Sequence, residues 1–144
     1  MKKRCFAIIL TLIVCFSIVP IGASAMVETP DADEVMPRFV AINTIYALLK
    51  IDESNGIATC VGEVRAREMV QLKVVVQLQR LEDGMWNTLY TWSNTGTLFA
   101  SKSGNYAIAR GYTYRAKVTG FVYDADGNII ESGSATHQVD YPKK

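Results

Sequence analysis

The stretch 110–139 constrains the fold of this chain more than any other. Its two halves alternate apolar and polar residues with a period of two, and between them lies Asp124-Ala125-Asp126-Gly127-Asn128. Such alternation is typical of β-strands, and a cluster of Asp, Gly and Asn is typical of a tight turn. The stretch therefore predicts a long antiparallel β-hairpin with one buried and one solvated face. In the first half, the residues on the expected buried face are Tyr112, Tyr114, Ala116, Val118 and Val122. Those on the other face are Thr113, Arg115, Lys117 and Thr119.

The preceding part of the chain repeats this pattern of short runs separated by turn signals. We expect strands at 39–51, 57–66, 70–81, 85–93 and 97–101, with turns at 52–56, 82–84 and 94–96 and a loop at 102–105. A short helix at 45–50 is an alternative, because Ala47, Leu48 and Leu49 are helix formers. About seven strands at this spacing predict an all-β fold, an antiparallel β-sandwich.

The amino terminus has the three parts of a secretory signal peptide. A basic start, Met1 to Arg4, precedes an apolar run at 5–21, and Ala23-Ser24-Ala25 forms an Ala-x-Ala cleavage site. We therefore expect residues 1–25 to be removed and the protein to be secreted. Residues 26–38 are acidic and interrupted by two prolines, which predicts a flexible arm before a sandwich domain at 39–141.

Two alternatives for this terminus are an uncleaved membrane anchor and a lipoprotein. The apolar run is short for a membrane span and is broken by Pro20 and Gly22. Lipoprotein processing at Cys15 requires a small preceding residue, and Val14 is not small. The cleaved signal is the simpler interpretation. The carboxy terminus shows neither a hydrophobic tail nor a sorting signal, so we expect the protein to be released or held non-covalently.

Charge and cysteine content exclude several classes of protein. The chain has 15 basic and 14 acidic residues, and the signal peptide takes away three of the basic ones. The remaining charge of about −2 gives no electrostatic reason to expect nucleic acid or an anionic membrane as a partner. Cys60 is the lone cysteine after cleavage, so no intramolecular disulfide is possible. Its thiol is either buried or available to a second molecule.

Residue patterns for catalysis and metal binding are absent. His137 is the lone histidine after the signal and ends an expected edge strand, where a solvated side chain is the simplest interpretation. Asp124 to Asn128 resembles the start of a calcium loop, but Gly127 is fourth and Glu131 eighth, not sixth and twelfth. We therefore expect no catalytic residue, no metal and no cofactor. A small hydrolase with two carboxylates across a cleft is the remaining enzymatic alternative.

An aromatic set on the strand at 85–93 is the best candidate for a binding site. Trp86, Tyr90 and Trp92, with Thr88, fall on one face by the period of two. They are either that strand's share of the core or an exposed platform on which sugar rings or peptides stack. The binding hypothesis assigns ligand contact to these three aromatic residues.

The segment Gly111-Tyr112-Thr113-Tyr114-Arg115 resembles the corner before strand F in immunoglobulin-like and fibronectin-III-like sandwiches. The resemblance implies that Tyr114 packs inward and that its hydroxyl caps the preceding loop. It also implies that Cys60 faces Ala116 across the core, where antibody domains carry a disulfide. The same corner, the signal peptide and the Asp-x-Asp-Gly-Asn hairpin before Glu-Ser resemble an uncharacterised family of small secreted proteins from Gram-positive bacteria. That resemblance implies a fold and no activity.

Together these features predict a secreted, non-enzymatic, immunoglobulin-like β-sandwich of bacterial origin. Its expected partner is an extracellular glycan, a cell-wall polymer or a protein. The alternative is self-assembly or partner association through an exposed strand edge or through Cys60.

Overall fold

The computed structural model describes residues 40–144, which form seven β-strands. The predicted signal peptide and the predicted acidic arm lie outside the described residues. The described part of the chain contains no helix long and apolar enough to cross a membrane. The strands are β1 (Ile42–Asp52), β2 (Ile57–Ala66), β3 (Gln71–Glu82), β4 (Met85–Thr97), β5 (Phe99–Ala107), β6 (Tyr112–Tyr123) and β7 (Ile129–Tyr141).

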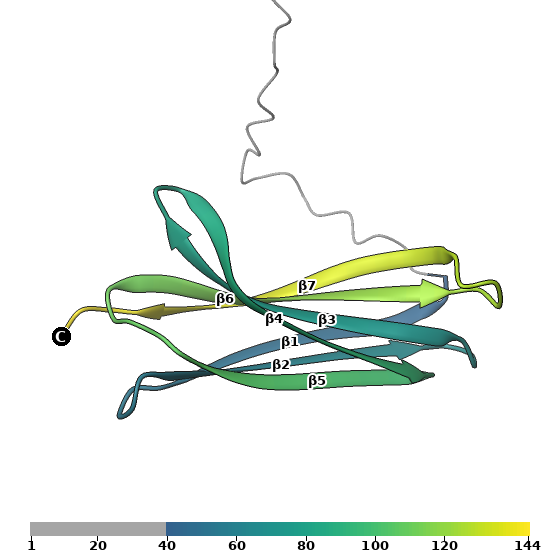
Figure 1. Ribbon diagram of the computed structural model, residues 1–144, viewed down its shortest axis with the longest axis horizontal. Coiled ribbons are helices and arrows are strands. Elements are labelled where there is room, and N and C mark those ends of the chain that lie inside the picture. Colours follow the sequence, from purple (N-terminus) through teal and green to yellow (C-terminus); the bar gives the residue numbers. More distant parts are fainter. Residues whose placement is uncertain (1–39) are drawn as a thin grey trace, which may run out of the picture. The chain divides into compact units, whose positions relative to one another are not determined.

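The seven strands form two packed sheets, and every strand pairing is antiparallel. One sheet has the order β1-β2-β5 and the other the order β4-β3-β6-β7. Figure 1 shows β1, β2 and β5 in one layer, with β6 and β7 in the other. The predicted antiparallel β-sandwich of about seven strands is confirmed.

The core lies between the sheets, where the inward residues of each strand meet. Leu72, Val74, Val76 and Leu78 of β3 are fully buried, as their period-2 spacing predicts. Burying each of these side chains contributes about 1.5–3 kcal/mol. The two sheets touch closely at Gly62 of β2, because a Cβ atom there would lie only 2.4 Å from Cγ2 of Val76.

The hairpin that the sequence predicted at 110–139 is formed by β6 and β7. Its predicted inward residues on β6 are buried, apart from Tyr112, which is 37% exposed at the start of the strand. Its turn is held by the amide of Asp124, which donates to the carbonyl of Asn128 at 3.0 Å, and Gly127 has a φ of 84°. Only glycine adopts such a value without strain.

The predicted strand is confirmed at residues 45–50, which lie within β1 and pair with β2, and the alternative of a short helix is wrong. Two predictions of local structure are also wrong: the predicted turn at 94–96 and the predicted loop at 102–105 are both strand. The chain instead changes sheets at Leu98, which has a φ of 67°. Its amide donates to Val70 and its carbonyl accepts from Ala66, and these two bonds hold the corner in place of a turn motif.

Candidate functional site

The three predicted aromatic residues of β4 do not share a face. The register of β3 with β4 shifts between Leu78 and Gln79, so that Leu89 is an extra residue in β4. Such a bulge reverses the alternation of side chains on either side of it. Tyr90 and Trp92 pair with the inward residues of β3, whereas Trp86 pairs with Leu81 on the outer face. The prediction that Trp86 shares a face with Tyr90 and Trp92 is therefore wrong.

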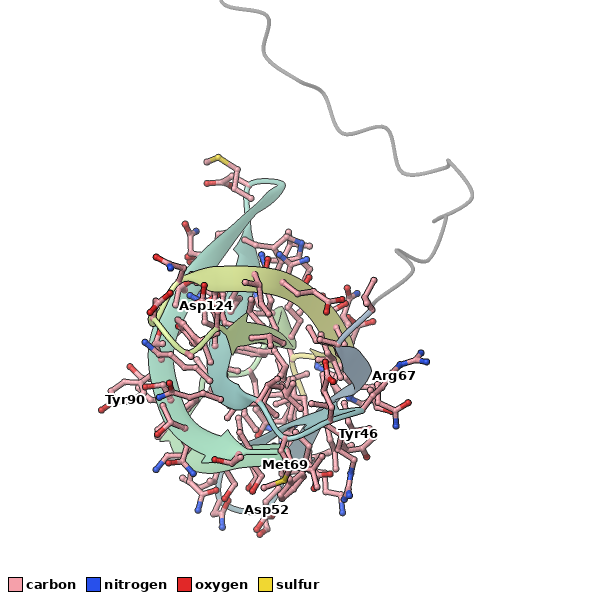
Figure 2. All side chains as sticks on the ribbon, turned by 90° about the vertical axis from the view of Figure 1, so that its right-hand side faces the viewer. Tyr46, Asp52, Arg67, Met69, Tyr90 and Asp124 are labelled. Carbon is pink, nitrogen blue, oxygen red and sulfur yellow. The ribbon has the colours of Figure 1, made fainter. Side chains whose placement is uncertain are left out.

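Tyr90 and Trp92 lie where β4 faces β5 along the open side of the sandwich. Their ring centroids are 4.8 Å apart, and Tyr90 lies 5.7 Å from Tyr106 of β5. Trp92 packs against the core and covers Gly104, where a Cβ atom would lie 2.2 Å from the indole ring. Tyr90 is 49% exposed and points away from the ribbon in Figure 2. Trp92 and Tyr106 pack against the core, whereas Tyr90 is half exposed. The rings are tilted by 48° and 37° to one another and form no flat platform.

Trp86 belongs to a separate cluster on the outer face of the four-stranded sheet. The Arg115 guanidinium carbon lies 4.1 Å from the centre of the Trp86 ring. Arg115 Nε donates to Gln79 Oε1 at 2.7 Å, and Gln79 Nε2 donates to Thr88 Oγ1 at 3.0 Å. Gln79 is only 7% exposed. The cluster is thus fixed by hydrogen bonds across β4, β3 and β6.

The surface around this cluster is cationic and rich in hydroxyl groups. The strand register places Lys73, Arg115 and Lys117 on this outer face. Asp140, an acid at the β7 edge of the same face, accepts a hydrogen bond from Thr113 Oγ1 at 2.7 Å. On this face, hydroxyl groups line β6 and the two edge strands of the sheet, β4 and β7. They belong to Thr91, Ser93, Thr95, Thr119, Ser132, Ser134 and Thr136.

Arginine stacked on an aromatic ring recurs over the surface. Of the five arginines in the described residues, four lie over a ring at 4.1–4.5 Å. Proteins show about one such contact per 70–80 residues, so the frequency here is unusual. The pairs are Arg65 with Phe99, Arg80 with Tyr112, Arg110 with Tyr141, and Arg115 with Trp86. Only the last pair lies on the face that carries the lysines.

The residues assigned structural roles lie in or against the core. Tyr114 is fully buried, and its hydroxyl donates to the carbonyl of Ala109 at 2.8 Å, which caps the loop before β6. Cys60 and Ala116 are both fully buried in the same core cluster. Burial raises the pKa of the Cys60 thiol to about 12. Cys60 therefore cannot serve as a surface thiol for self-assembly, and that part of the predicted alternative is wrong.

His137 and Glu131 extend from β7 to the edge of β1. The Glu131 carboxylate accepts hydrogen bonds from the amides of Val40, Ala41 and Ile42 at 2.9, 2.6 and 3.1 Å. His137 Nδ1 accepts one from the amide of Leu49 at 3.1 Å. His137 is exposed on an edge strand, as predicted, but it is bonded to the protein and not only to solvent. Sequence analysis missed the role of Glu131.

The acidic turns show no catalytic or metal-binding geometry. Hydrogen bonds from Asn128 and neighbouring amides lower the pKa of the Asp124 carboxyl, and bonds from Ser54 and Asn55 lower that of Asp52. A general acid requires the opposite shift. The described residues contain no group of three or more potential metal ligands. A shallow, open pocket beside the end of β7 is lined by residues 111–113 and 140–143.

Comparison with known proteins adds no family to this description. No protein-family model matches the chain, and no curated protein matches it in sequence.

Proposed function

We propose that this protein is a secreted, non-enzymatic binding module that takes an anionic glycan or cell-wall polymer on the outer face of its four-stranded sheet. The observation that carries the proposal is the Trp86 and Arg115 stack, which Gln79 and Thr88 hold at one end of a cationic, hydroxyl-rich face. Secretion rests on the signal-like sequence at 1–25.

Anionic polymers suit this face for three physical reasons. Lys73, Arg115 and Lys117 supply positive charge along two neighbouring strands. The acid Asp140 lies at the β7 edge, diagonally opposite Arg115, and accepts a hydrogen bond from Thr113. Rows of hydroxyl groups supply donors and acceptors for sugar hydroxyls or phosphate oxygens. A guanidinium already stacked on a ring is oriented before the ligand arrives, which lowers the ordering cost of binding.

The immunoglobulin-like form of the sandwich is part of the same proposal. In the lettering of such domains, β1, β2 and β5 take the places of A, B and E, and β3, β6 and β7 those of C, F and G. β4 lies beside β3, where variable-type domains place C′. The Tyr114 hydroxyl bonded to Ala109 supports this assignment, because a tyrosine corner forms at the start of strand F.

A binding role fits the described residues better than the hydrolase alternative. The two carboxyls with shifted pKa values, Asp52 and Asp124, are occupied by turn hydrogen bonds and favour the ionised form. Neither has the raised pKa of a general acid.

The test is retention of the chain, without its expected signal peptide, on immobilised polymers. The probes are a polyuronic acid, a poly(glycerol phosphate) wall polymer and a neutral glucan. We expect binding to either anionic polymer that weakens with added salt. Lys117→Glu on the outer face should weaken it at least about tenfold, because charge repulsion replaces attraction.

Lys50→Glu is the matched control, because Lys50 is an exposed lysine of β1 in the other sheet. It should change affinity by less than about twofold. Absence of binding to both anionic polymers would refute the proposal. Equal losses from Lys117→Glu and Lys50→Glu would refute the assignment to this face.

A further inference from the structure

The four edge strands of the two sheets differ in charge. Exposed edges invite pairing with other strands, and natural proteins protect them with charged side chains. β1 carries Lys50 and Asp52, β5 carries Lys102, and β7 carries Glu131 and Asp140. β4 and β7 are the longest of these strands, with 13 residues each, and β4 has no charged residue.

Two of the charged edges are also occupied within the molecule. Glu131 and His137 of β7 accept hydrogen bonds from the β1 amides of Ile42 and Leu49, so these two strands protect one another. The start of β5 lies beside the end of β4, where Asn94 Nδ2 donates to the Ser101 carbonyl at 3.0 Å. The first part of β4 has no comparable cover among the described residues.

The open part of β4 lies before Asn94. Within the described residues β4 pairs with β3 only, so its other edge has no partner strand. Figure 1 shows the tip of the β3–β4 hairpin rising away from the other strands. Tyr90 and Met85 on this segment are 49% and 65% exposed.

We propose that two copies of this chain associate through β4, edge to edge and antiparallel. An antiparallel pair has a twofold axis perpendicular to the sheet, so the same segment serves both copies. Each side chain of β4 would then lie opposite a side chain of β4 in the second copy. Because β4 is uncharged, this self-pairing opposes no like charges in any register. In contrast, β5 carries Lys102, β7 carries two acids, and β1 is held against β7.

The association joins two four-stranded sheets into one sheet of eight strands. Because the twofold axis is perpendicular to the sheet, both outer faces point the same way. The Trp86 and Arg115 clusters of the two copies therefore lie on one continuous surface. This association does not depend on the ligand proposed above, and its test involves no ligand.

The test is sedimentation equilibrium of the chain without its expected signal peptide, from about 1 μM to about 1 mM. We expect the mass to rise with concentration towards that of a dimer. Ser93→Lys introduces a charge on the β4 edge and should raise the dissociation constant at least about tenfold.

Ser134→Lys is the matched control. Ser93 and Ser134 are both exposed, lie in the same cross-strand row as Val75 and Thr119, and end that row at opposite edges of the sheet. Ser134→Lys should leave the dissociation constant within about twofold of the original. A monomer throughout the concentration range, or equal effects of the two substitutions, would overturn the proposal.

If the Ser93→Lys variant does not fold, cysteine crosslinking tests the same pairing. Single cysteines are placed in turn at the positions from Asn87 to Ser93. The position nearest the twofold axis should form an intermolecular disulfide under mild oxidation, because only there does a residue lie opposite its own copy and within disulfide reach. Buried Cys60 does not compete. A Ser134→Cys variant should remain uncrosslinked. Absence of crosslinking at every position from Asn87 to Ser93, or crosslinking of Ser134→Cys to the same extent as the best of them, would contradict pairing through β4.

Discussion

Replacing Glu131 by alanine tests how the sandwich closes between β1 and β7. The Glu131 carboxylate accepts three amide hydrogen bonds from residues 40–42, at 2.6–3.1 Å. A hydrogen bond to a charged group contributes about 1.5–3 kcal/mol when buried. These three are exposed or partly buried, so water replaces part of each, and about 1 kcal/mol per bond is a suitable value. Glu131→Ala should therefore lower the free energy of unfolding by about 3 kcal/mol.

Chemical denaturation monitored by circular dichroism measures this loss of unfolding free energy. In a domain of this size, a loss of about 3 kcal/mol corresponds to a decrease in Tm of about 12–24 °C. Glu63→Ala is the control, since Glu63 makes only a 4.0 Å ion pair with Arg65. That change should cost less than about 0.5 kcal/mol. If Glu131→Ala costs no more than Glu63→Ala, the carboxylate does not hold the start of β1 and the reasoning fails.

Two further predictions concern the core. Tyr114→Phe removes the hydroxyl that bonds to Ala109 and should cost about 1–2 kcal/mol of stability in urea denaturation, with no change in the secondary structure seen by circular dichroism; an unchanged midpoint would contradict the capping role. Cys60, whose pKa burial raises to about 12 from an ordinary 9.0, should resist iodoacetamide at pH 8 in the native protein and react once the protein is unfolded in urea. The unfolded thiol ionises at the lower pH, so this group's contribution to stability is present below about pH 9 and is lost as pH rises towards 12. Rapid labelling of the native thiol at pH 8 would show that Cys60 is accessible.

The sequence predicted the strands whose alternation is regular. Leu72 to Leu78 on β3 and Tyr114 to Val122 on β6 keep a strict period of two, and the structure buries these faces. The turn at Asp124 to Asn128 was predictable as well, because Asp, Gly and Asn favour its backbone angles. These elements depend on local sequence and on one buried face.

The errors arise where contacts distant in sequence decide the geometry. No local pattern marks the bulge at Leu89, which depends on the pairing of β4 with β3. The corner at Leu98 was missed because a non-glycine residue takes a positive φ there, held by bonds to Val70 and Ala66. Glu131 was missed for the same reason. Its pairing with buried Val122 follows from a register shift between Val122 and Tyr123, and no local pattern marks that shift.

The bulge at Leu89 connects the proposed binding face with the proposed edge. Without the extra residue, Trp86 would follow the phase of Tyr90 and Trp92 and would face away from Arg115. With it, Trp86 lies under the Arg115 guanidinium on the outer face, while Tyr90 and Trp92 lie beside β5. One inserted residue thus gives the outer face its aromatic group, on the same strand whose uncharged edge is proposed to pair with a second copy.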